Sequence, residues 1–454
     1  MPIPSSVHGR TVYDHDRRYV FHSWSAQAQL DPLVVADAAG SEVVDADGRR
    51  YLDFSSQLVY TNLGHKHPAI VAAIQEQAAR LPTIAPAYAN EVRSEAARLI
   101  VQQAPEAIEK VFFTVGGAEA VENAIRMARQ FTGRYKVLSQ YRSYHGSTSM
   151  AINATGDHRR WANDYGSSGS VHFFGPFLYR TVFQATNERE ECERALTHLE
   201  EVIRFEGPQA FAALILETIP GTAGVMPPPP GYLAGVREIC DRYGIVLILD
   251  EVMVGFGRTG AWFASEHYDV QPDLMTFAKG VNSGYVPLGG VMVNGPIAHF
   301  FDERPYPGGM TYSGHLLACA AAVATIETMI AEDVPAQAAV LGSDVLGPGL
   351  TALARRHPSV GDVRGLGAFW ALDLVVDRDT KEPIAPYGGS SEAISRTLTA
   401  ARDAGLLLFH QYHRIHLAPP LTMTHEDARR GLALLDTVLD LTDGYTTAGT
   451  PAAA

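Results

Sequence analysis

The sequence predicts an α/β fold in which a large domain with a mostly parallel central sheet is joined to a smaller α+β domain. Between about residues 94 and 293, helical patterns alternate with short, unbroken apolar strands. This alternation is typical of a parallel sheet covered by helices on both faces. Near residue 334 the pattern changes, and single strands separated by helices follow. A chain of 454 residues is long enough for two or three domains.

The elements follow in chain order. A hairpin is predicted over residues 41–54, because Asp47-Gly48 is a turn sequence between alternating residues. Residues 67–80 have helical spacing with an early proline. Further helices are predicted over residues 94–104, 117–131, 188–206 and 230–243. Strands are predicted over residues 110–114, 135–140, 212–217, 245–250, 273–277, 288–293, 369–376 and 415–418.

These elements divide the chain into three parts. Residues 1–65 form an N-terminal segment that contributes to the small domain, because its hairpin can complete the small domain's sheet. Residues 66–330 form the large domain, and residues 331–454 form the C-terminal small domain.

Composition and charge exclude several classes of partner. The net charge is −14 and no basic block appears, which argues against nucleic acid. No apolar run is long enough to cross a membrane, and no secretory signal is visible at the N-terminus. The cysteines, Cys192, Cys240 and Cys319, have no metal-like spacing and cannot all pair. This favours reduced thiols in the cytoplasm and no metal site.

Lys279 is the strongest single indication of chemistry. It is one of five lysines, and it follows the apolar run Met275-Thr-Phe-Ala278 and precedes a glycine-rich segment. An amine placed against apolar surface is poorly solvated as a cation, so its pKa falls and it becomes a nucleophile. Schiff-base lysines need this environment. An ordinary lysine at a strand end is the alternative, which the other motifs must exclude.

Two segments are suited to binding a phosphate. Thr114-Val-Gly-Gly-Ala118 is a strand end, a glycine turn and a helix start. The backbone amides of Gly117 and Ala118 would therefore be free, and the helix dipole favours an anion there. No Gly-Lys-Ser/Thr follows, so this is not a Walker A loop. Thr311, before an alanine-rich helix, is a second phosphate ligand candidate.

Other candidate groups stand where predicted strands end. Asp250 ends a buried strand, at the edge where open α/β sheets bind ligands. A carboxylate there can keep a pyridine nitrogen protonated. Tyr144 offers a flat face for a ring. His145 is either a general base or a structural histidine, and Glu217 closes another strand. A lysine nucleophile, a carboxylate, an aromatic face and two phosphate elements together match pyridoxal 5′-phosphate (PLP).

From about Ser41 to Thr424 the chain resembles the class III aminotransferases, the ω-aminotransferase group of fold-type I PLP enzymes. The most specific motif is Leu249-Asp-Glu-Val-Met-Val-Gly-Phe-Gly-Arg-Thr-Gly260, followed by Phe277-Ala-Lys-Gly280. Supporting matches are Gly64-His-Lys-His-Pro68, Gly116-Gly-Ala-Glu-Ala-Val-Glu-Asn-Ala-Ile-Arg126, Tyr144-His-Gly146, Thr311-Tyr-Ser-Gly-His315 and Ala418-Pro-Pro-Leu421.

The resemblance implies a role for each of these residues. Lys279 would carry the cofactor as a Schiff base and move the proton, and Asp250 would pair with the pyridine nitrogen. Tyr144 and Val252 would cover the two ring faces, with His145 and Glu217 near the ring. Gly117 and Ala118 would hold the phosphate. Thr311 would bind the phosphate of the neighbouring subunit's cofactor, which implies a homodimer or a dimer of dimers with active sites at the interface.

The substrate side departs from the family pattern. Met253 replaces a glutamine that many relatives place against the ring hydroxyl. Phe409 or His410 occupies the usual place of an arginine that binds an α-carboxylate, which leaves Arg414 as a candidate for that role. The segments around Trp24, Leu58 and Tyr88 are similar to the taurine aminotransferase branch, which implies that these three side chains line the substrate pocket.

The resemblance implies ping-pong transfer of an amino group from a terminal amine, such as taurine, β-alanine or a GABA-like donor, to pyruvate or 2-oxoglutarate. Decarboxylation of a dialkylated amino acid, or an aminomutase reaction, would use the same cofactor residues and is the nearest alternative. A non-catalytic nucleotide-binding protein that uses Asp250-Glu251 and Gly116-Gly117 is the alternative from a different class.

Overall fold

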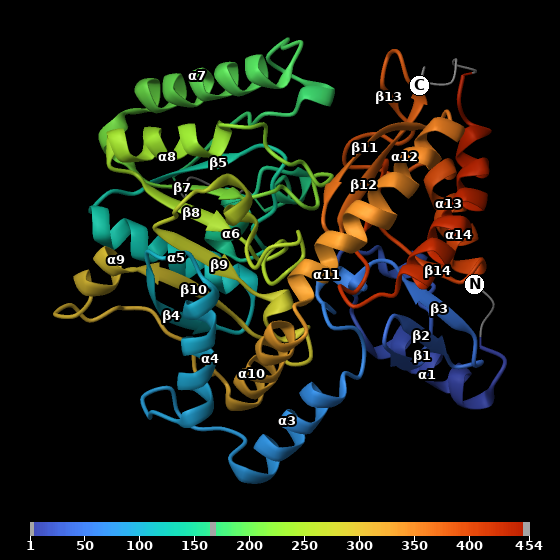
Figure 1. The fold of residues 1–454 in the computed structure, drawn as a ribbon, viewed down its shortest axis with the longest axis horizontal. Helices are drawn as coiled ribbons and strands as arrows, with labels where there is room; N and C mark the ends of the chain where they lie inside the picture. Colours follow the sequence, from blue (N-terminus) through green and yellow to red (C-terminus); the bar gives the residue numbers. More distant parts are fainter. Residues whose placement is uncertain (1–3, 164–168, 448–454) are drawn as a thin grey trace.

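The computed structural model describes residues 4–163 and 169–447. These residues form two lobes (Figure 1). The larger lobe contains a seven-stranded sheet in the order β4-β10-β9-β8-β7-β5-β6, in which β10 alone runs antiparallel to its neighbours. Its strands are β4 (Ile108–Thr114), β5 (Lys136–Gln140), β6 (Ser170–Phe173), β7 (Phe211–Glu217), β8 (Val246–Asp250), β9 (Leu274–Phe277) and β10 (Gly289–Asn294).

The central strands are apolar throughout because helices cover both faces of this sheet. Every residue of β7 and β8 is buried. Ala213 and Ile215 face the cluster that contains α5, and Leu214 and Leu216 face the cluster that contains α7 and α8. Figure 1 shows α7 and α8 above the sheet and α5 below it. Alternate residues along each strand therefore pack into two separate hydrophobic cores, one on each face of the sheet.

The smaller lobe combines both ends of the chain. A four-stranded sheet has the order β1-β2-β3-β14, and β14 pairs with β3 in parallel, with Leu406 opposite Leu52. A second sheet has the order β11-β12-β16-β15, with β13 beside β12. The strands are β1 (Val35–Ala39), β2 (Glu42–Asp45), β3 (Arg50–Asp53), β11 (Val360–Leu366), β12 (Phe369–Asp377), β13 (Glu382–Pro383), β14 (Leu406–Leu407), β15 (Phe409–Gln411) and β16 (Arg414–Leu417).

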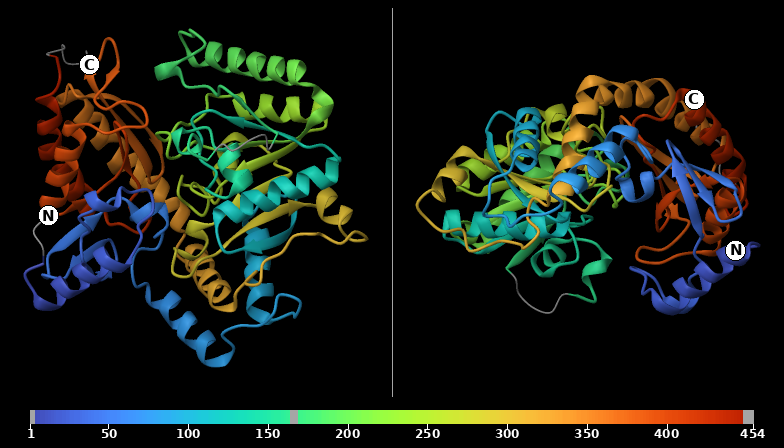
Figure 2. Two further views of the ribbon diagram at one scale, coloured as in Figure 1. Left: turned by 180° about the vertical axis from the view of Figure 1, so that it is seen from behind. Right: turned by 90° about the horizontal axis from the view of Figure 1, so that it is seen from below.

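The helices pack around these sheets, and α3 lies beside α10 at the edge of the larger lobe (Figures 1 and 2). Their bounds are α1 (Val7–Tyr19), α2 (Ser56–Val59), α3 (Pro68–Arg80), α4 (Glu91–Gln103), α5 (Gly117–Thr132), α6 (Ser149–Ala154), α7 (Glu188–Glu206), α8 (Tyr232–Tyr243), α9 (Gly295–Phe300), α10 (Leu316–Ala331), α11 (Val334–Leu341), α12 (Gly347–Arg356), α13 (Glu392–Asp403) and α14 (His425–Asp443).

The predicted fold class is confirmed, and each predicted helix and strand has a counterpart whose ends differ by at most three residues. The sequence analysis did not predict several elements, among them α1, α6, α9, α14, β1, β6, β11 and β15. Among the residues of α1 only Gly9 is buried, so that helix carries no apolar stripe to mark it. The division at residues 65 and 330 stays a prediction.

In the described part of the chain, no helix is both long enough and apolar enough to cross a membrane. Cys192, Cys240 and Cys319 are buried and carry free thiols.

Asp373, on β12, is the centre of a buried cluster of charges. Its carboxylate lies 2.8 Å from Arg180 Nη2, 3.1 Å from Arg364 Nη2, 3.3 Å from His413 Nε2 and 3.5 Å from Arg414 Nε. Burial alone would raise the pKa of Asp373, but contact with His413 and the charges of Arg364 and Arg414 hold it well below its usual range.

Replacing Asp373 with asparagine is expected to lower the free energy of unfolding by about 3 kcal/mol, because buried cations lose their counter-charge. Since folding depresses this pKa, the stabilisation is present above the ordinary carboxyl pKa of about 4 and is lost only in strongly acidic solution. Urea denaturation at pH 7 measures the effect. Asp379→Asn, at an exposed turn, is the matched control. A change below about 0.5 kcal/mol, the range of ordinary surface substitutions, would contradict this view of the cluster.

Candidate active site

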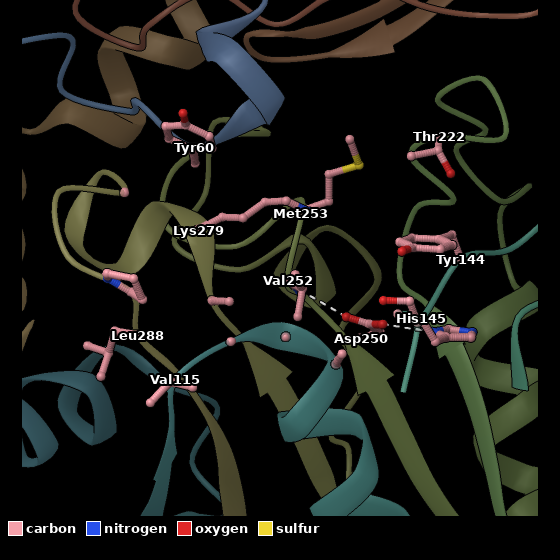
Figure 3. A pocket seen from close by; sticks show the side chains of 18 of the residues that line it. Tyr60, Val115, Tyr144, His145, Thr222, Asp250, Val252, Met253, Lys279 and Leu288 are labelled. Carbon is pink, nitrogen blue, oxygen red and sulfur yellow. Dashed lines mark hydrogen bonds and ion pairs between the residues drawn. The ribbon is translucent and has the colours of Figure 1, made fainter. Parts of the chain in front are cut away.

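A cavity of about 390 Å³, here called the inner cavity, lies at the carboxyl ends of the strands of the seven-stranded sheet (Figure 3). A neighbouring cavity of about 550 Å³, here called the outer cavity, shares Trp24, Tyr144, Thr222, Met253 and Lys279 with it. The two are therefore one continuous site. The residues predicted from the sequence that line the inner cavity are Trp24, Gly117, Ala118, Tyr144, His145, Glu217, Asp250, Val252 and Lys279.

Lys279 opens a short turn directly after β9, with a φ of +48°. This left-handed backbone directs a non-glycine residue into the cavity at some cost in strain, as is common at functional sites. Enclosure of the amine lowers the pKa of Lys279, and the positive charge of Arg159 lowers it further. The carboxylates of Asp250 and Glu217 oppose the shift. The structure thus places a readily deprotonated amine beside two acids.

Asp250 is held by three hydrogen bonds. Its Oδ1 accepts from Thr276 Oγ1 at 3.0 Å and from the amide of Val252 at 3.1 Å, and its Oδ2 accepts from His145 Nδ1 at 2.7 Å. Figure 3 shows the contacts with Val252 and His145. Asp250 is only 4% exposed. His145 Nε2 is buried and has no partner within the described residues. Since a carboxylate only accepts, Nδ1 carries the proton, and His145 orients Asp250.

Glu217, at the end of β7, positions a loop. Its Oε1 accepts from the amide of Tyr144 at 2.8 Å, and its Oε2 accepts from the amide of Gly221 at 2.7 Å. Burial raises the pKa of Glu217 to about 7, and the charge of Asp250 acts in the same direction. His145 and the two amides oppose this shift. Glu217 therefore fixes the backbone that carries Tyr144.

The N-terminus of α5 forms one wall of the inner cavity. Gly116 is its N-cap and provides no side-chain cap, so the first amides of the helix point to the cavity. In the described residues neither the amide of Gly117 nor that of Ala118 has an acceptor. A Cβ on Gly117 would lie 2.8 Å from Val252 Cγ1, which explains the glycine. Free amides at a helix N-terminus suit an anion such as phosphate.

Three predicted site residues lie elsewhere. Arg414 lines neither cavity, because its side chain turns to Asp373, and its role in substrate binding stays a prediction. Tyr88 is 64% exposed and Thr311 is exposed, and neither lines a cavity in this subunit. Their loops are neighbours, because the Arg93 guanidinium donates to the carbonyls of Tyr88, at 2.9 Å, and Gly314, at 2.9 Å.

The outer cavity contains a functional candidate that the sequence analysis missed, Arg159. Its Cζ lies 3.6 Å from the centroid of the Tyr144 ring, and Asp157 and Thr222 hold its nitrogens. Leu58, a predicted substrate-pocket residue, also lines this cavity. Arg159 stands in no motif, and only its proximity to Tyr144 in space distinguishes it from other arginines.

Comparisons of sequence and of structure both match this chain to aminotransferases. The family model described as aminotransferase class III matches residues 24–439. A taurine–pyruvate aminotransferase of Bilophila wadsworthia is 33% identical, with 93% of this chain and 95% of that protein covered. The 4-aminobutyrate aminotransferase GabT of Escherichia coli is also 33% identical, with 91% and 94% covered.

Solved structures resemble the whole chain. A taurine:2-oxoglutarate aminotransferase from Bifidobacterium kashiwanohense, in complex with PLP and glutamate, has a TM-score of 0.93 and 43% identity, with 96% of this chain and 98% of that chain covered. A PLP-bound amine transaminase from an uncultivated Pseudomonas species has a TM-score of 0.89 and 35% identity, with 93% and 98% covered. The chain therefore belongs to the class III aminotransferases, enzymes whose cofactor is pyridoxal 5′-phosphate.

Proposed function

We propose that this enzyme transfers the amino group of a terminal amine that carries an acid group, such as taurine, β-alanine or a GABA-like donor, to a 2-oxo acid by a ping-pong reaction. One observation carries this proposal. The amine of Lys279 lies in a site whose inner part fits PLP and whose outer part presents the guanidinium of Arg159. The taurine and 4-aminobutyrate aminotransferases among the relatives support this substrate class.

The residues of the inner cavity fit the cofactor. The free amides of Gly117 and Ala118 would hold the phosphate, and the buried carboxylate of Asp250 would face the pyridine nitrogen. Tyr144 and Val252 would cover the ring faces. When bound, PLP supplies a reactive aldehyde and an electron sink that stabilises negative charge at the substrate carbon.

The side chains of the protein provide the remaining chemistry. Lys279 would hold the cofactor through its amine, and the same amine, once freed, would move a proton on and off the substrate carbon. Glu217 keeps Tyr144 in place while this happens. Met253, at the position where many relatives have glutamine, presents an apolar side chain to both cavities.

The outer cavity limits what can enter. Four rings, here called the aromatic wall, come from both lobes: His158 and Trp161 from the larger, and Tyr387 and Tyr412 from the smaller. His158 and Tyr412 are hydrogen-bonded to each other and line the cavity. The acid tail of a substrate held beside Arg159 would therefore lie next to His158 and Tyr412 of this wall.

Half-reactions with a panel of amines test the proposal. Purified enzyme is expected to be yellow and to lose its colour when mixed with taurine, β-alanine or 4-aminobutyrate, and to regain it with pyruvate or 2-oxoglutarate. A yellow enzyme that reacts with none of these amines would contradict the substrate class. Carbon dioxide or an isomerised product without a free oxo product would favour the decarboxylase or aminomutase reaction instead.

We also propose a dimer that completes the site, in a cytoplasmic setting. The loops of Tyr88 and Thr311 are joined through Arg93 and both residues are exposed, and Thr311 is the residue expected at the phosphate of a neighbour's cofactor. The buried free cysteines are consistent with a reducing compartment. Sedimentation of the holoenzyme measures the assembly, and a PLP-loaded, fully active monomer would contradict it.

A further inference from the structure

We propose that Asp53 and Gln57 are positioning residues that shape the substrate side of the active site. The carboxylate of Asp53 holds Gln57 in a backbone conformation suited to glycine. The turn held in this way sets the side chains that follow, Leu58 and Tyr60, against the two cavities. This inference rests on the proposed function, because it concerns how the substrates of that function are positioned.

The backbone between β3 and Tyr60 is strained. Although this segment is labelled α2, three of its four residues have a positive φ: +45° at Ser56, +63° at Gln57 and +62° at Val59. Gln57 combines its φ with a ψ of −101°, outside the left-handed region that residues other than glycine can enter. A positive φ is an outlier for a β-branched residue such as Val59. Strain of this kind persists only where the surroundings fix it, and it gathers at functional sites.

The Asp53 side chain, at the end of β3, is fully buried and is surrounded by donors from this turn. Its Oδ1 accepts from Ser55 Oγ at 2.7 Å and from the amides of Ser55 and Gln57 at 3.1 and 3.3 Å. Its Oδ2 accepts from Gln57 Nε2 at 2.9 Å and lies 3.0 Å from His65 Nε2. Burial would raise the pKa of Asp53, but these contacts lower it below its ordinary value, so the carboxylate is charged at pH 7. One charged group therefore binds both the backbone and the side chain of Gln57.

The far end of the turn is fixed from the larger lobe. Arg258 is fully buried, and its Nη2 donates to Asn62 Oδ1 at 2.8 Å and to Ser56 Oγ at 3.3 Å. Val59 is buried in a hydrophobic cluster that contains residues of both lobes. Because both ends of the turn are anchored, the strain in its middle cannot be relieved by a shift of the whole turn.

The turn carries two side chains that face the site. Leu58 lines the outer cavity, and Tyr60 lines the inner cavity together with Lys279 (Figure 3). The Tyr60 ring also packs against the backbone of Gly284, where a Cβ would lie 2.2 Å from its Cδ2. A change of backbone at Gln57 would turn both Leu58 and Tyr60. It would alter the space left for a substrate without removing any group that would hold PLP.

The test uses the PLP-loaded enzyme and follows the cofactor absorbance in the amine half-reaction. Asp53→Asn is expected to lower the second-order rate constant for taurine about 30-fold, because an amide cannot accept from both Gln57 and His65 and the turn relaxes. Ethylamine, which lacks the acid tail of taurine, is expected to lose less than about threefold. The ratio of the two rate constants is the decisive quantity, since a loss of folded enzyme would lower both equally.

A glycine at position 57 provides the rescue, since glycine adopts this backbone without strain and needs no carboxylate to hold it. Asp53→Asn/Gln57→Gly is expected to react with taurine at least about tenfold faster than Asp53→Asn, and Gln57→Gly alone is expected to differ from the wild type by less than about threefold. Asp302→Asn is the matched control, because Asp302 is an exposed aspartate that pairs with Lys110 and lines neither cavity.

Three outcomes would overturn the inference. Equal losses with taurine and ethylamine would show that Asp53 only keeps the protein folded. A double variant as slow as Asp53→Asn would show that the carboxylate does not act by holding Gln57 in its strained conformation. A wild-type enzyme that reacts with no acid-bearing amine would remove the proposed function as well, and this result is distinguished from the other two because it needs no variant.

Discussion

Replacing Lys279 with alanine is expected to reduce transamination about 10⁴-fold, the upper end of what one positioned proton-transfer group contributes. The loss is large because the same amine both bonds the cofactor and moves the proton. No other lysine lines either cavity in the described residues, so nothing can substitute for it. The measurement is single-turnover and steady-state kinetics with β-alanine or taurine as donor.

The absorbance spectrum of the bound cofactor distinguishes loss of the lysine's chemistry from loss of the folded cofactor site. Lys279→Ala is expected to bind PLP through the amides at α5 and Asp250, but borohydride treatment is expected to leave no cofactor covalently attached to the chain, because no lysine amine bonds it. Lys66→Ala is the matched control, because Lys66 is an exposed lysine that pairs with Asp37 and lines neither cavity. Sustained multiple turnover by Lys279→Ala would refute the assignment of the nucleophile.

Replacing Asp250 with asparagine is expected to lower the turnover rate about 10²- to 10³-fold, the range for removing one preorganised charge-stabilising group. Asparagine has nearly the same shape and keeps part of the hydrogen bonding to Thr276 and Val252. It removes the negative charge that faces the inner cavity. A pyridine nitrogen without that charge is less readily protonated, so the cofactor becomes a weaker electron sink.

The neighbouring residue provides the control for Asp250→Asn. Glu251 is fully buried and accepts from Thr218 Oγ1 and from the amides of Ala264 and Ser265, and it does not line the cavity. Glu251→Gln is expected to change the melting temperature more than the turnover rate. Equal turnover by Asp250→Asn and the wild type would exclude the pairing of Asp250 with the pyridine nitrogen.

The sequence was most informative where burial is complete. The strands β7 and β8 could be predicted because all their residues are apolar or end in a single carboxylate. Glu217 and Asp250 could be predicted as site residues because each ends one of these strands, and the carboxyl ends of parallel strands meet at one edge of the sheet. The pairing of β14 with β3 could not be predicted. The strand β14 has only two residues, which carry no periodic pattern, and it lies about 350 positions along the chain from β3.

The substrate side was less predictable for a physical reason. Arg414 lies on β16, and a strand residue can face either of two sides. The sequence analysis expected the side of the active site, but Asp373, opposite Arg414 on β12, draws the guanidinium the other way. Arg159 lies in a short turn without a pattern, and only the fold brings it to Tyr144.

The buried charges around Asp373 also connect the two lobes mechanically. Arg180 belongs to the segment between β6 and α7 in the larger lobe, whereas Asp373 belongs to β12 in the smaller one. Hinge motion would pull a buried carboxylate away from its guanidinium, at a cost of several kcal/mol. The pair of Arg180 and Asp373 therefore opposes a hinge motion that would separate the two lobes at this point.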